Sequence, residues 1–246
     1  MSVMLVTGGS RGIGAATCRL AAEAGWQVVV NYAGNKTAAE AVVAGINAAG
    51  AQAIAMQGDV AQEADVKAMY DAAEAMGPVT AVVVNAGVVG QVCTVAEMET
   101  DRIRNVLDTN ILGAILTCRE AARRMPLNKG GPGGAIVITS SAAARLGSPN
   151  EFVDYAASKG ATDTLTMGLA KEIGPHGVRV NAVRPGLIET DIHASAGAPD
   201  RVERLMGGVP MGRAGSAEEV AKAIVWLAGD GASYVSGTFV DVAGGR

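Results

Sequence analysis

Short apolar runs alternate along this chain with longer segments in which apolar and polar residues are mixed. The short runs, rich in Val, Ile and Ala, predict buried strands, and the longer mixed segments predict helices. Strands are expected at residues 3–6, 28–30, 53–55, 81–84, 135–138, 178–183 and 238–242. Helices are expected near residues 13–24, 37–49, 63–76, 101–124, 153–173 and 217–227.

This alternation predicts an α/β fold of the doubly wound, Rossmann type. Strands that are apolar throughout are typical of a parallel sheet with helices on both faces, and right-handed crossovers give the doubly wound arrangement. We expect about seven parallel strands in a single domain that spans residues 1–246. Ligands of such sheets bind beyond the carboxyl ends of the strands, so the loops at that edge are the candidates for function.

Two segments interrupt the alternation. Residues 126–134 are rich in Gly and Pro and are expected to form a surface loop. Residues 187–210 are polar, rich in small residues and too long for an ordinary connection. Because this second segment follows a strand end, it is expected to be a substrate lid, with a surface insertion as the alternative.

Composition narrows the possible functions. A net charge of −4 argues against a nucleic-acid-binding protein, whose binding surface is usually basic. Three cysteines that lie far apart (Cys18, Cys93, Cys118) indicate neither a disulfide framework nor a metal site, and they fit a reducing compartment. With no secretory leader and no membrane-spanning apolar run, we expect a cytoplasmic protein without membrane contact. The two histidines are not expected to bind metal. His176 is expected at a helix end, whereas His193 falls in the predicted lid, with contact to the substrate as the alternative role.

A glycine-rich loop follows the first predicted strand and opens the first predicted helix. It comprises Thr7, Gly8, Gly9, Ser10, Arg11, Gly12, Ile13 and Gly14. Glycines at such a junction let the backbone approach a pyrophosphate, which the positive helix N-terminus attracts. The loop therefore predicts dinucleotide binding, although a glycine-rich turn without a ligand would have the same composition.

The sequence at the end of the second predicted strand favours NADP over NAD. A carboxylate at this point would hold the ribose 2′-hydroxyl of NAD, but the chain has Asn31 and Tyr32 instead. Arg11 in the glycine loop and the nearby Lys36 supply positive charge for a 2′-phosphate. NADP(H) is therefore the expected cofactor, with NAD(H) as the alternative.

Tyr155 and Lys159 are four residues apart within a predicted helix, so their side chains lie on the same face. A tyrosine titrates near pH 10, and a lysine cation beside it is expected to lower the phenol pKa toward neutrality. The pair is thus a candidate general acid/base that moves a hydroxyl proton. Tyr32 and Lys36 have the same spacing, but Gly34 and Asn35 between them predict a turn, so that pair is placed near the adenosine of the cofactor.

With the glycine loop and Tyr155-x-x-x-Lys159 together, the chain resembles the short-chain dehydrogenase/reductase family over its whole length. The resemblance extends to several further motifs. Asp59 and Val60 match the pair that contacts adenine, and Asn85, Ala86 and Gly87 match the end of the Asn-Asn-Ala-Gly motif. The segment that grips the nicotinamide end is matched by Pro185, Gly186, Ile188 and Thr190.

The resemblance also implies the catalytic residues. Ser141 would orient the substrate oxygen, and Tyr155 would donate or remove its proton. Lys159 would lower the tyrosine pKa and hold the nicotinamide ribose, while Asn110 would position a relay water. The implied activity is hydride transfer between NADP(H) and a small carbonyl or secondary alcohol, with no metal ion.

Two positions depart from the family pattern. Val84 replaces the first asparagine of the Asn-Asn-Ala-Gly motif, where a change in packing rather than in chemistry is expected. One residue more than in many members separates Ser141 from Tyr155, and it falls in residues 148–154. This longer loop beside the pocket is expected to reshape access for the substrate.

The resemblance is closest to 3-oxoacyl-carrier-protein reductases and glucose 1-dehydrogenases, and it implies a homotetramer. Small residues along the predicted helix at residues 153–173 suit helix pairing between subunits, or equally packing on the sheet. Three other functions stay open: an NAD-preferring sugar or alcohol dehydrogenase, a sugar-nucleotide epimerase or dehydratase, and a non-catalytic dinucleotide-binding regulator. The epimerase group typically has a longer substrate domain, and a regulator would typically have lost a catalytic residue.

Overall fold

The computed structural model describes the backbone of residues 1–246 and every side chain except those of residues 192 and 193. The strands are β1 (Val3–Val6), β2 (Gln27–Tyr32), β3 (Ala53–Gln57), β4 (Val79–Val84), β5 (Gly134–Thr139), β6 (Val178–Pro185), β7 (Ile188–Glu189), β8 (Gly215–Ser216) and β9 (Phe239–Val242). The longer helices are α1 (Gly12–Glu23), α2 (Lys36–Ala48), α3 (Glu63–Met76), α4 (Thr100–Leu107), α5 (Gly113–Arg124), α7 (Val153–Ile173) and α10 (Ala217–Ala228). The short helices are α6 (Ala143–Leu146), α8 (Ile192–Ser195) and α9 (Arg201–Leu205).

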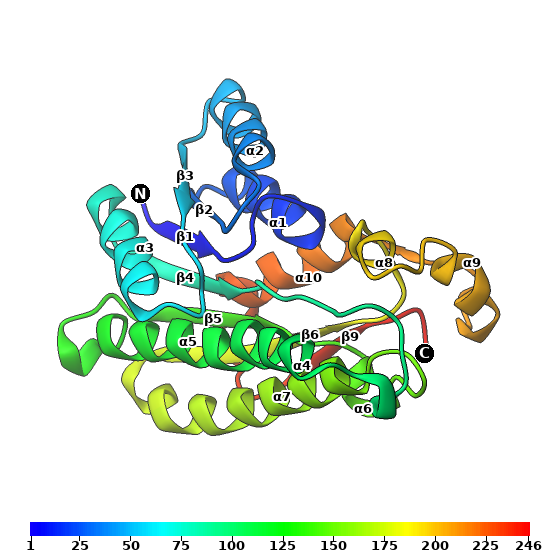
Figure 1. Cartoon of the computed structure of the whole chain (residues 1–246). Helices are drawn as coiled ribbons and strands as arrows, with labels where there is room; N and C mark the ends of the chain where they lie inside the picture. Colours follow the sequence, from blue (N-terminus) through cyan, green and yellow to red (C-terminus); the bar gives the residue numbers. More distant parts are fainter.

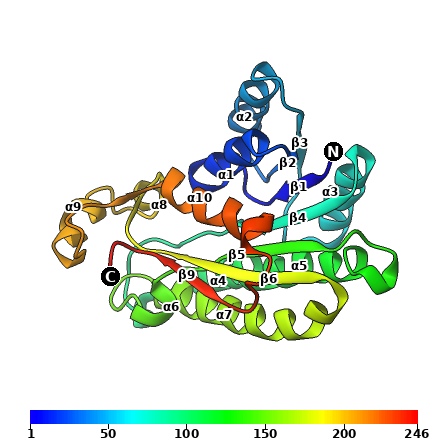
Figure 2. The same ribbon diagram turned by 180° about the vertical axis from the view of Figure 1, so that it is seen from behind.

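A parallel seven-stranded sheet with the order β3-β2-β1-β4-β5-β6-β9 forms the centre of the described structure. Helices α3, α4, α5 and α7 cover one face of this sheet, and α1, α2 and α10 cover the other (Figures 1 and 2). The prediction of a doubly wound α/β fold with about seven parallel strands is therefore confirmed. The strand order reverses beside β1, so the loops after β1 and β4 diverge and leave a crevice between them.

Alternation along the strands builds two apolar cores. In β1, Val3 and Leu5 pack in the core beneath α3, α5 and α7, whereas Met4 and Val6 pack in the core beneath α1, α2 and α10. All four side chains are fully buried. Because both faces of the strand are covered, the sequence is apolar throughout rather than alternating with polar residues.

The long helix expected near residues 101–124 is divided in the structure. A π-helical turn (Asp108–Leu112) separates α4 from α5. Such turns place one more residue in a helical turn and often occur at functional sites. Here the turn contains the buried Asn110, whose side chain bonds the backbone of Val88 outside the helix.

The segment at residues 187–210 projects from one side of the molecule (Figures 1 and 2). Its short strand β7 pairs in parallel with β8, and helices α8 and α9 follow it (Figure 1). Leu187, Val209 and Ala214 are buried together in a small third core, against which Val202 and Leu205 pack. The other predicted interruption, at residues 126–134, is a loop with one 3-10 turn (Leu127–Lys129). No helix in the described part of the chain is long and apolar enough to cross a membrane.

Candidate active site

A cavity of about 1130 Å³ lies at the carboxyl ends of the parallel strands. It is the position that the fold predicts for a ligand, because the loops after β1, β2, β3, β4, β5 and β6 all meet there. Every residue predicted to contact the cofactor lines it: Gly8, Ser10, Arg11, Gly12, Ile13, Gly14, Asn31, Tyr32, Asp59, Val60, Asn85, Ala86, Gly87, Tyr155, Lys159, Pro185, Gly186, Ile188 and Thr190. Lys36 is not among the lining residues; it begins α2, and its ammonium lies 3.6 Å from the carboxylate of Glu40.

Two glycines of the loop after β1 leave no room for a side chain. Gly8 has a φ of +63°, and a Cβ there would lie 2.9 Å from the Cα of Ala86. A Cβ on Gly14 would lie 2.2 Å from the carbonyl oxygen of Gly8. The bare backbone thus brings the N-terminus of α1 to the cavity wall, where its unpaired N–H groups suit a phosphate.

The hydroxyl of Thr7 joins the two loops that border the crevice. It accepts hydrogen bonds from the backbone N–H groups of Asn85 (2.9 Å) and Ala86 (3.1 Å), and it donates to the carbonyl of Val83. The Asn85 amide in turn donates to the carbonyls of Thr7 and Gly8, both at 3.1 Å. Asn85 therefore holds the glycine loop in place, and Val84 before it is buried in the core, as its apolar character requires.

Asn31 at the end of β2 has a structural role in the adenosine wall. Its side chain is buried, accepts a hydrogen bond from the N–H of Gly8 at 3.1 Å and donates to the carbonyl of Gly58 at 2.9 Å. Arg11, in the same loop as the Gly8 that Asn31 bonds, also lines the cavity and is exposed. The described residues that line this end after β2 contain no carboxylate up to Asn35.

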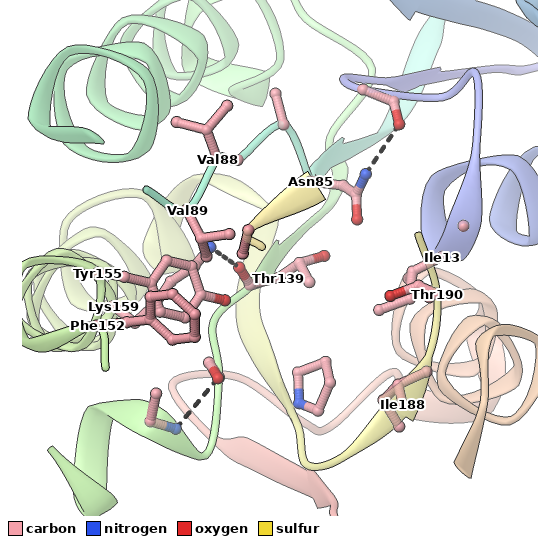
Figure 3. Close-up of a pocket in the computed structure, with 18 of the residues that line it drawn as sticks. Ile13, Asn85, Val88, Val89, Thr139, Phe152, Tyr155, Lys159, Ile188 and Thr190 are labelled. Carbon is pink, nitrogen blue, oxygen red and sulfur yellow. Dashed lines mark hydrogen bonds between the residues drawn. The ribbon is translucent and has the colours of Figure 1, made fainter. Parts of the chain in front are cut away.

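Tyr155 and Lys159 project from α7 into the cavity, opposite Ile13, Ile188 and Thr190 (Figure 3). The Lys159 ammonium lies 5.6 Å from the centre of the Tyr155 ring and donates a 2.7 Å hydrogen bond to the carbonyl of Thr139. On the loop after β5, the hydroxyl of Ser141 is hydrogen-bonded with the phenol and accepts from the N–H of Ala143 at 3.1 Å. The serine, tyrosine and lysine side chains thus meet at one wall.

The electrostatics of this wall differ from the sequence-based expectation. Burial raises the pKa of Tyr155, and the hydrogen bond from Ser141 and the charge of Arg201 only partly oppose this. Burial also lowers the pKa of Lys159 to about 8, against the effect of the Asp163 carboxylate. The prediction that Lys159 brings the tyrosine pKa toward neutrality is therefore wrong for this structure. The ammonium is directed to the Thr139 carbonyl, and loss of solvent dominates the energy of the phenolate.

Asn110 lies behind the cavity wall rather than on it. Its side-chain oxygen accepts from the N–H of Val88 at 2.8 Å, and its amide donates to the Val88 carbonyl at 2.9 Å and to the Ser158 hydroxyl at 3.0 Å. These bonds fix the loop after β4 against α7, one residue before Lys159. The side chain is fully engaged, which leaves the main chain of the π-helical turn for any contact with a proton relay.

Several functional neighbours were missed by the sequence analysis. Thr139 lines the cavity, and its buried Oγ1 has no hydrogen-bond partner among the described residues. Asp163, four residues after Lys159, accepts from the Ser140 hydroxyl at 2.6 Å and from Arg184 at 2.7 Å. The helical spacing from Lys159 was a usable signal for Asp163, whereas nothing in the sequence indicates that Arg184 is its partner.

A second buried ion pair lies beneath the mouth of the cavity. Both oxygens of Asp154, at the start of α7, accept from the guanidinium of Arg102 on α4 at 3.0 Å. Arg102 also donates to the carbonyl of Gln91 and contacts Cys93. This arginine therefore connects the loop after β4 with the start of the helix that carries Tyr155.

The segment at residues 187–210 forms part of the cavity wall through Leu187, Ile188, Thr190, Asp191, Ala196, Arg201, Arg204 and Leu205. The loop at residues 148–154 also lines the cavity, and its Glu151 contacts Arg201 and Arg204 of this segment. His176 ends a 3-10 turn after α7 and does not line the cavity. The predicted contact of His193 lies outside the described side chains.

Comparisons with known proteins agree with this geometry. Residues 8–246 match the family model described as enoyl-(acyl carrier protein) reductase. The Escherichia coli protein named uncharacterized oxidoreductase YgfF is 54% identical over the full length of both chains. A short-chain dehydrogenase from Burkholderia cenocepacia, solved in complex with NADP, is 35% identical, with a TM-score of 0.90 over 99% of this chain and 97% of that one. A 3-ketoacyl-(acyl-carrier-protein) reductase from Brucella melitensis, complexed with NADH, is 30% identical, with a TM-score of 0.91 over 100% of this chain and 98% of that one.

Proposed function

Because this chain belongs to the short-chain dehydrogenase/reductase family and is an oxidoreductase, we propose that it uses NADP(H) to interconvert a carbonyl compound and the corresponding secondary or primary alcohol, with Tyr155 as general acid/base. One observation supports this proposal above all. The side chains of Ser141, Tyr155 and Lys159 face the same cavity as the glycine loop after β1. A proton-transfer group and a dinucleotide loop on one cavity are what hydride transfer to a carbonyl requires.

The cavity walls suit a nicotinamide dinucleotide. At one end, the loop containing Gly8 and Gly14 exposes backbone N–H groups at the start of α1, as a pyrophosphate requires. At the other end, the buried Oγ1 of Thr139 has no partner among the described residues and lines the cavity beside Lys159. A buried hydroxyl without a hydrogen-bond partner destabilises the folded protein, and a ligand that supplies a partner removes this cost. The hydroxyl and carboxamide groups of a nicotinamide riboside would satisfy it.

Each residue of the site has a separate role in the reaction. When bound, the nicotinamide supplies or accepts the hydride. Ser141 donates a hydrogen bond to the substrate oxygen and orients it beside the phenol, and Tyr155 gives its proton to that oxygen as negative charge develops. Lys159 would hold the ribose of the bound cofactor, and Asn110 fixes the loop after β4 against α7.

The raised pKa of Tyr155 favours the reductive direction at neutral pH. A phenol that keeps its proton is a ready general acid, whereas oxidation of an alcohol requires the phenolate. We therefore propose carbonyl reduction as the direction to which the protein is adapted.

NADP(H) is proposed over NAD(H) on the basis of charge. Arg11 is an exposed cation on the adenosine end of the cavity, and no carboxylate follows β2 there in the described lining. A 2′-phosphate beside the end of β2 would therefore meet a cation, whereas the carboxylate of Asp59, which also lines the cavity, follows β3. The two structural relatives described above, one with NADP and one with NADH, support either cofactor.

We further propose that residues 187–210 act as the substrate lid of one catalytic domain spanning residues 1–246. Their place on the cavity wall supports this.

A homotetramer is proposed because Leu112, Ile115 and Met167 are each more than two-fifths exposed on neighbouring helical elements. Three free cysteines support a reducing, cytoplasmic location.

The proposal is tested by supplying NADPH with a panel of aldehydes, ketones, sugars and acyl thioesters and following the loss of NADPH absorbance. We expect turnover with at least one class. Replacement of Tyr155 by Phe should reduce the turnover number about 10²- to 10⁴-fold, while NADPH still binds in a fluorescence titration. If no class reacts although NADPH binds, the protein is a dinucleotide-binding regulator; if the Phe variant keeps its rate, Tyr155 is not the acid.

A further inference from the structure

Three charged side chains meet at the mouth of the cavity. Arg201 and Arg204 lie on α9, in the proposed lid, and both donate to the one carboxylate of Glu151, at 2.9 Å and 2.8 Å. The Arg201 and Glu151 side chains are largely buried, at 16% and 13% exposure, whereas Arg204 is 46% exposed. Two cations therefore share the carboxylate of Glu151, and Arg204, the more exposed of them, is also affected by the charge of Asp200.

The backbone immediately before Glu151 has an unusual conformation, which positions this carboxylate. Ser148 and Asn150 both adopt positive φ angles, of 44° and 63°, which side chains other than glycine rarely adopt. They lie in residues 148–154, the loop in which one extra residue relative to the family pattern is expected. Backbone strain of this kind persists only where the surrounding contacts maintain it, and it concentrates at functional sites.

Arg201 retains hydrogen-bonding capacity on its cavity side. Its Nε bonds Glu151, and its guanidinium lies 5.3 Å from the centre of the Phe152 ring. Within the described part of the chain, Nε is the atom of this guanidinium that makes a hydrogen bond, and the two terminal NH₂ groups make none. Arg201 lines the cavity and its charge acts on the Tyr155 phenol, so its unpaired NH₂ groups are available to a substrate bound in that cavity.

The remainder of this part of the cavity is mainly apolar. Val89 projects from the loop after β4 beside Tyr155 (Figure 3), and Val88, Leu146 and Leu205 also line the wall. An apolar wall binds the body of a substrate without fixing its orientation. The free guanidinium edge is then the group that selects the far end of the substrate, and planar carboxylates match its geometry.

We propose that Arg201 is a specificity-determining residue that binds a carboxylate at the end of the substrate remote from the carbonyl. The substrate class is therefore an oxo acid: an aldehyde or ketone on an apolar body with a terminal carboxylate. This inference rests on the proposed carbonyl reduction. Glu151 orients Arg201 through Nε and leaves the terminal NH₂ groups for the substrate.

Matched pairs of substrates test the inference. Aromatic and aliphatic aldehydes with a terminal carboxylate are compared with their methyl esters, which keep the carbonyl and the apolar body but lose the charge. We expect kcat/KM with NADPH to favour the acid by about tenfold or more in the native protein. Replacement of Arg201 by Gln should abolish this acid-to-ester ratio, mainly through KM of the acid.

Two further variants separate recognition from closure of the lid. Replacement of Glu151 by Gln removes the competing anion, so we expect the acid-to-ester ratio to be retained or increased. Arg213, which pairs with Glu219 outside the main cavity, is the matched control, and its change to Gln should leave the ratio unaltered.

The outcomes distinguish the two proposals. Equal turnover of acids and esters by the native protein would overturn the role of Arg201 and leave carbonyl reduction intact. Parallel losses for acids and esters in both the Arg201 and Glu151 variants would likewise overturn it, because they would show that the ion pair only holds the lid. No turnover of any carbonyl compound would instead overturn the proposed function.

Discussion

The ammonium of Lys159 and the main-chain carbonyl of Thr139 are joined by a 2.7 Å hydrogen bond at the cavity wall (Figure 3). Lys159 is almost fully buried there, and burial lowers its pKa to about 8. The folded protein thus holds a cation that would be better solvated in the unfolded chain. Burial of the Lys159 ammonium is consequently expected to lower the free energy of unfolding. The residue is retained because it functions at the site.

The pH dependence of stability follows from this lowered pKa. Between pH 8 and the ordinary lysine pKa of 10.5, the unfolded chain binds more protons at this group than the folded protein does. Its destabilising effect is therefore fully present below pH 8 and is relieved as the pH rises toward 10.5. We expect Lys159→Met to raise the free energy of unfolding by about 1–3 kcal/mol at pH 7, and by much less near pH 10.

Urea denaturation of both proteins at the two pH values checks this prediction. Lys67, an exposed lysine paired with Glu63, provides the control, since its change to Met removes no buried charge. A Lys159→Met protein that is less stable than the native one at pH 7 would contradict the predicted cost of burial.

Ser141 is predicted to set the alkaline limit of carbonyl reduction. Its hydrogen bond lowers the pKa of Tyr155, so its loss should let the phenol keep its proton to higher pH. In Ser141→Ala we expect kcat to fall about tenfold or more, and the alkaline inflection of the kcat/KM profile to move to higher pH. An inflection that stays in place or moves to lower pH would show that the serine does not act on the phenol.

Arg11 is predicted to select the cofactor. It is exposed on the adenosine end of the cavity, where a 2′-phosphate would accept its hydrogen bonds. We expect Arg11→Ala to weaken NADPH binding about tenfold and to leave NADH binding nearly unchanged. Fluorescence titration with both cofactors measures this.

Arg19 supplies a matched control for that experiment. It lies on α1, is exposed and does not line the cavity. Arg19→Ala should alter neither affinity. An equal loss of NADPH and NADH binding in Arg11→Ala would contradict selection of the phosphate by this residue.

The buried pair of Arg102 and Asp154 is predicted to stabilise the start of α7. Their side chains are 13% and 4% exposed, and two hydrogen bonds join them. Arg102→Leu would leave a buried carboxylate without its partner, which typically costs about 3–5 kcal/mol. Thermal and urea unfolding should show this loss.

A double substitution tests whether the unpaired charge is responsible. Asp154→Asn introduced into the Arg102→Leu protein should restore part of the lost stability, because it removes the uncompensated charge. Additive losses from the two substitutions would mean that the residues act independently.

The exposed apolar side chains on α5 and α7 are predicted to lie between subunits. Ile115 is 44% exposed on α5, and Met167 on α7 is exposed to the same extent. Ile115→Glu should therefore reduce the mass measured by light scattering from that of a tetramer to that of a smaller species. Leu127→Glu, at an even more exposed position on the loop after α5, should leave the mass unchanged.

The sequence predicted the fold well because central strands such as β1 are apolar on both sides. In β1, four consecutive apolar residues fill two cores, and this pattern has few explanations other than a covered parallel sheet. The carboxyl ends of the predicted strands then indicated where the cavity lies. The π-helical turn escaped notice because a single extra residue barely changes the apolar pattern from α4 to α5.

The charges around the site were less predictable than its residues. Tyr155 and Lys159 were recognised by their spacing, but their pKa values depend on burial, which the spacing does not reveal. The contact between Glu151 and Arg201 joins residues 50 positions apart, and it depends on how the segment after β6 folds back over the cavity. Local patterns contain no information about such a contact.

The hydroxyl of Thr7 bonds the backbone of Asn85, and 78 residues separate the two along the chain. The pyrophosphate end of the cavity therefore has a high contact order: its loop is shaped only after β4 has joined β1 in the sheet. A chain that has been synthesised only through β3 contains the entire glycine motif but lacks the partner that fixes its shape. Cofactor binding is consequently a late event in folding, and it reports that the centre of the sheet has been completed.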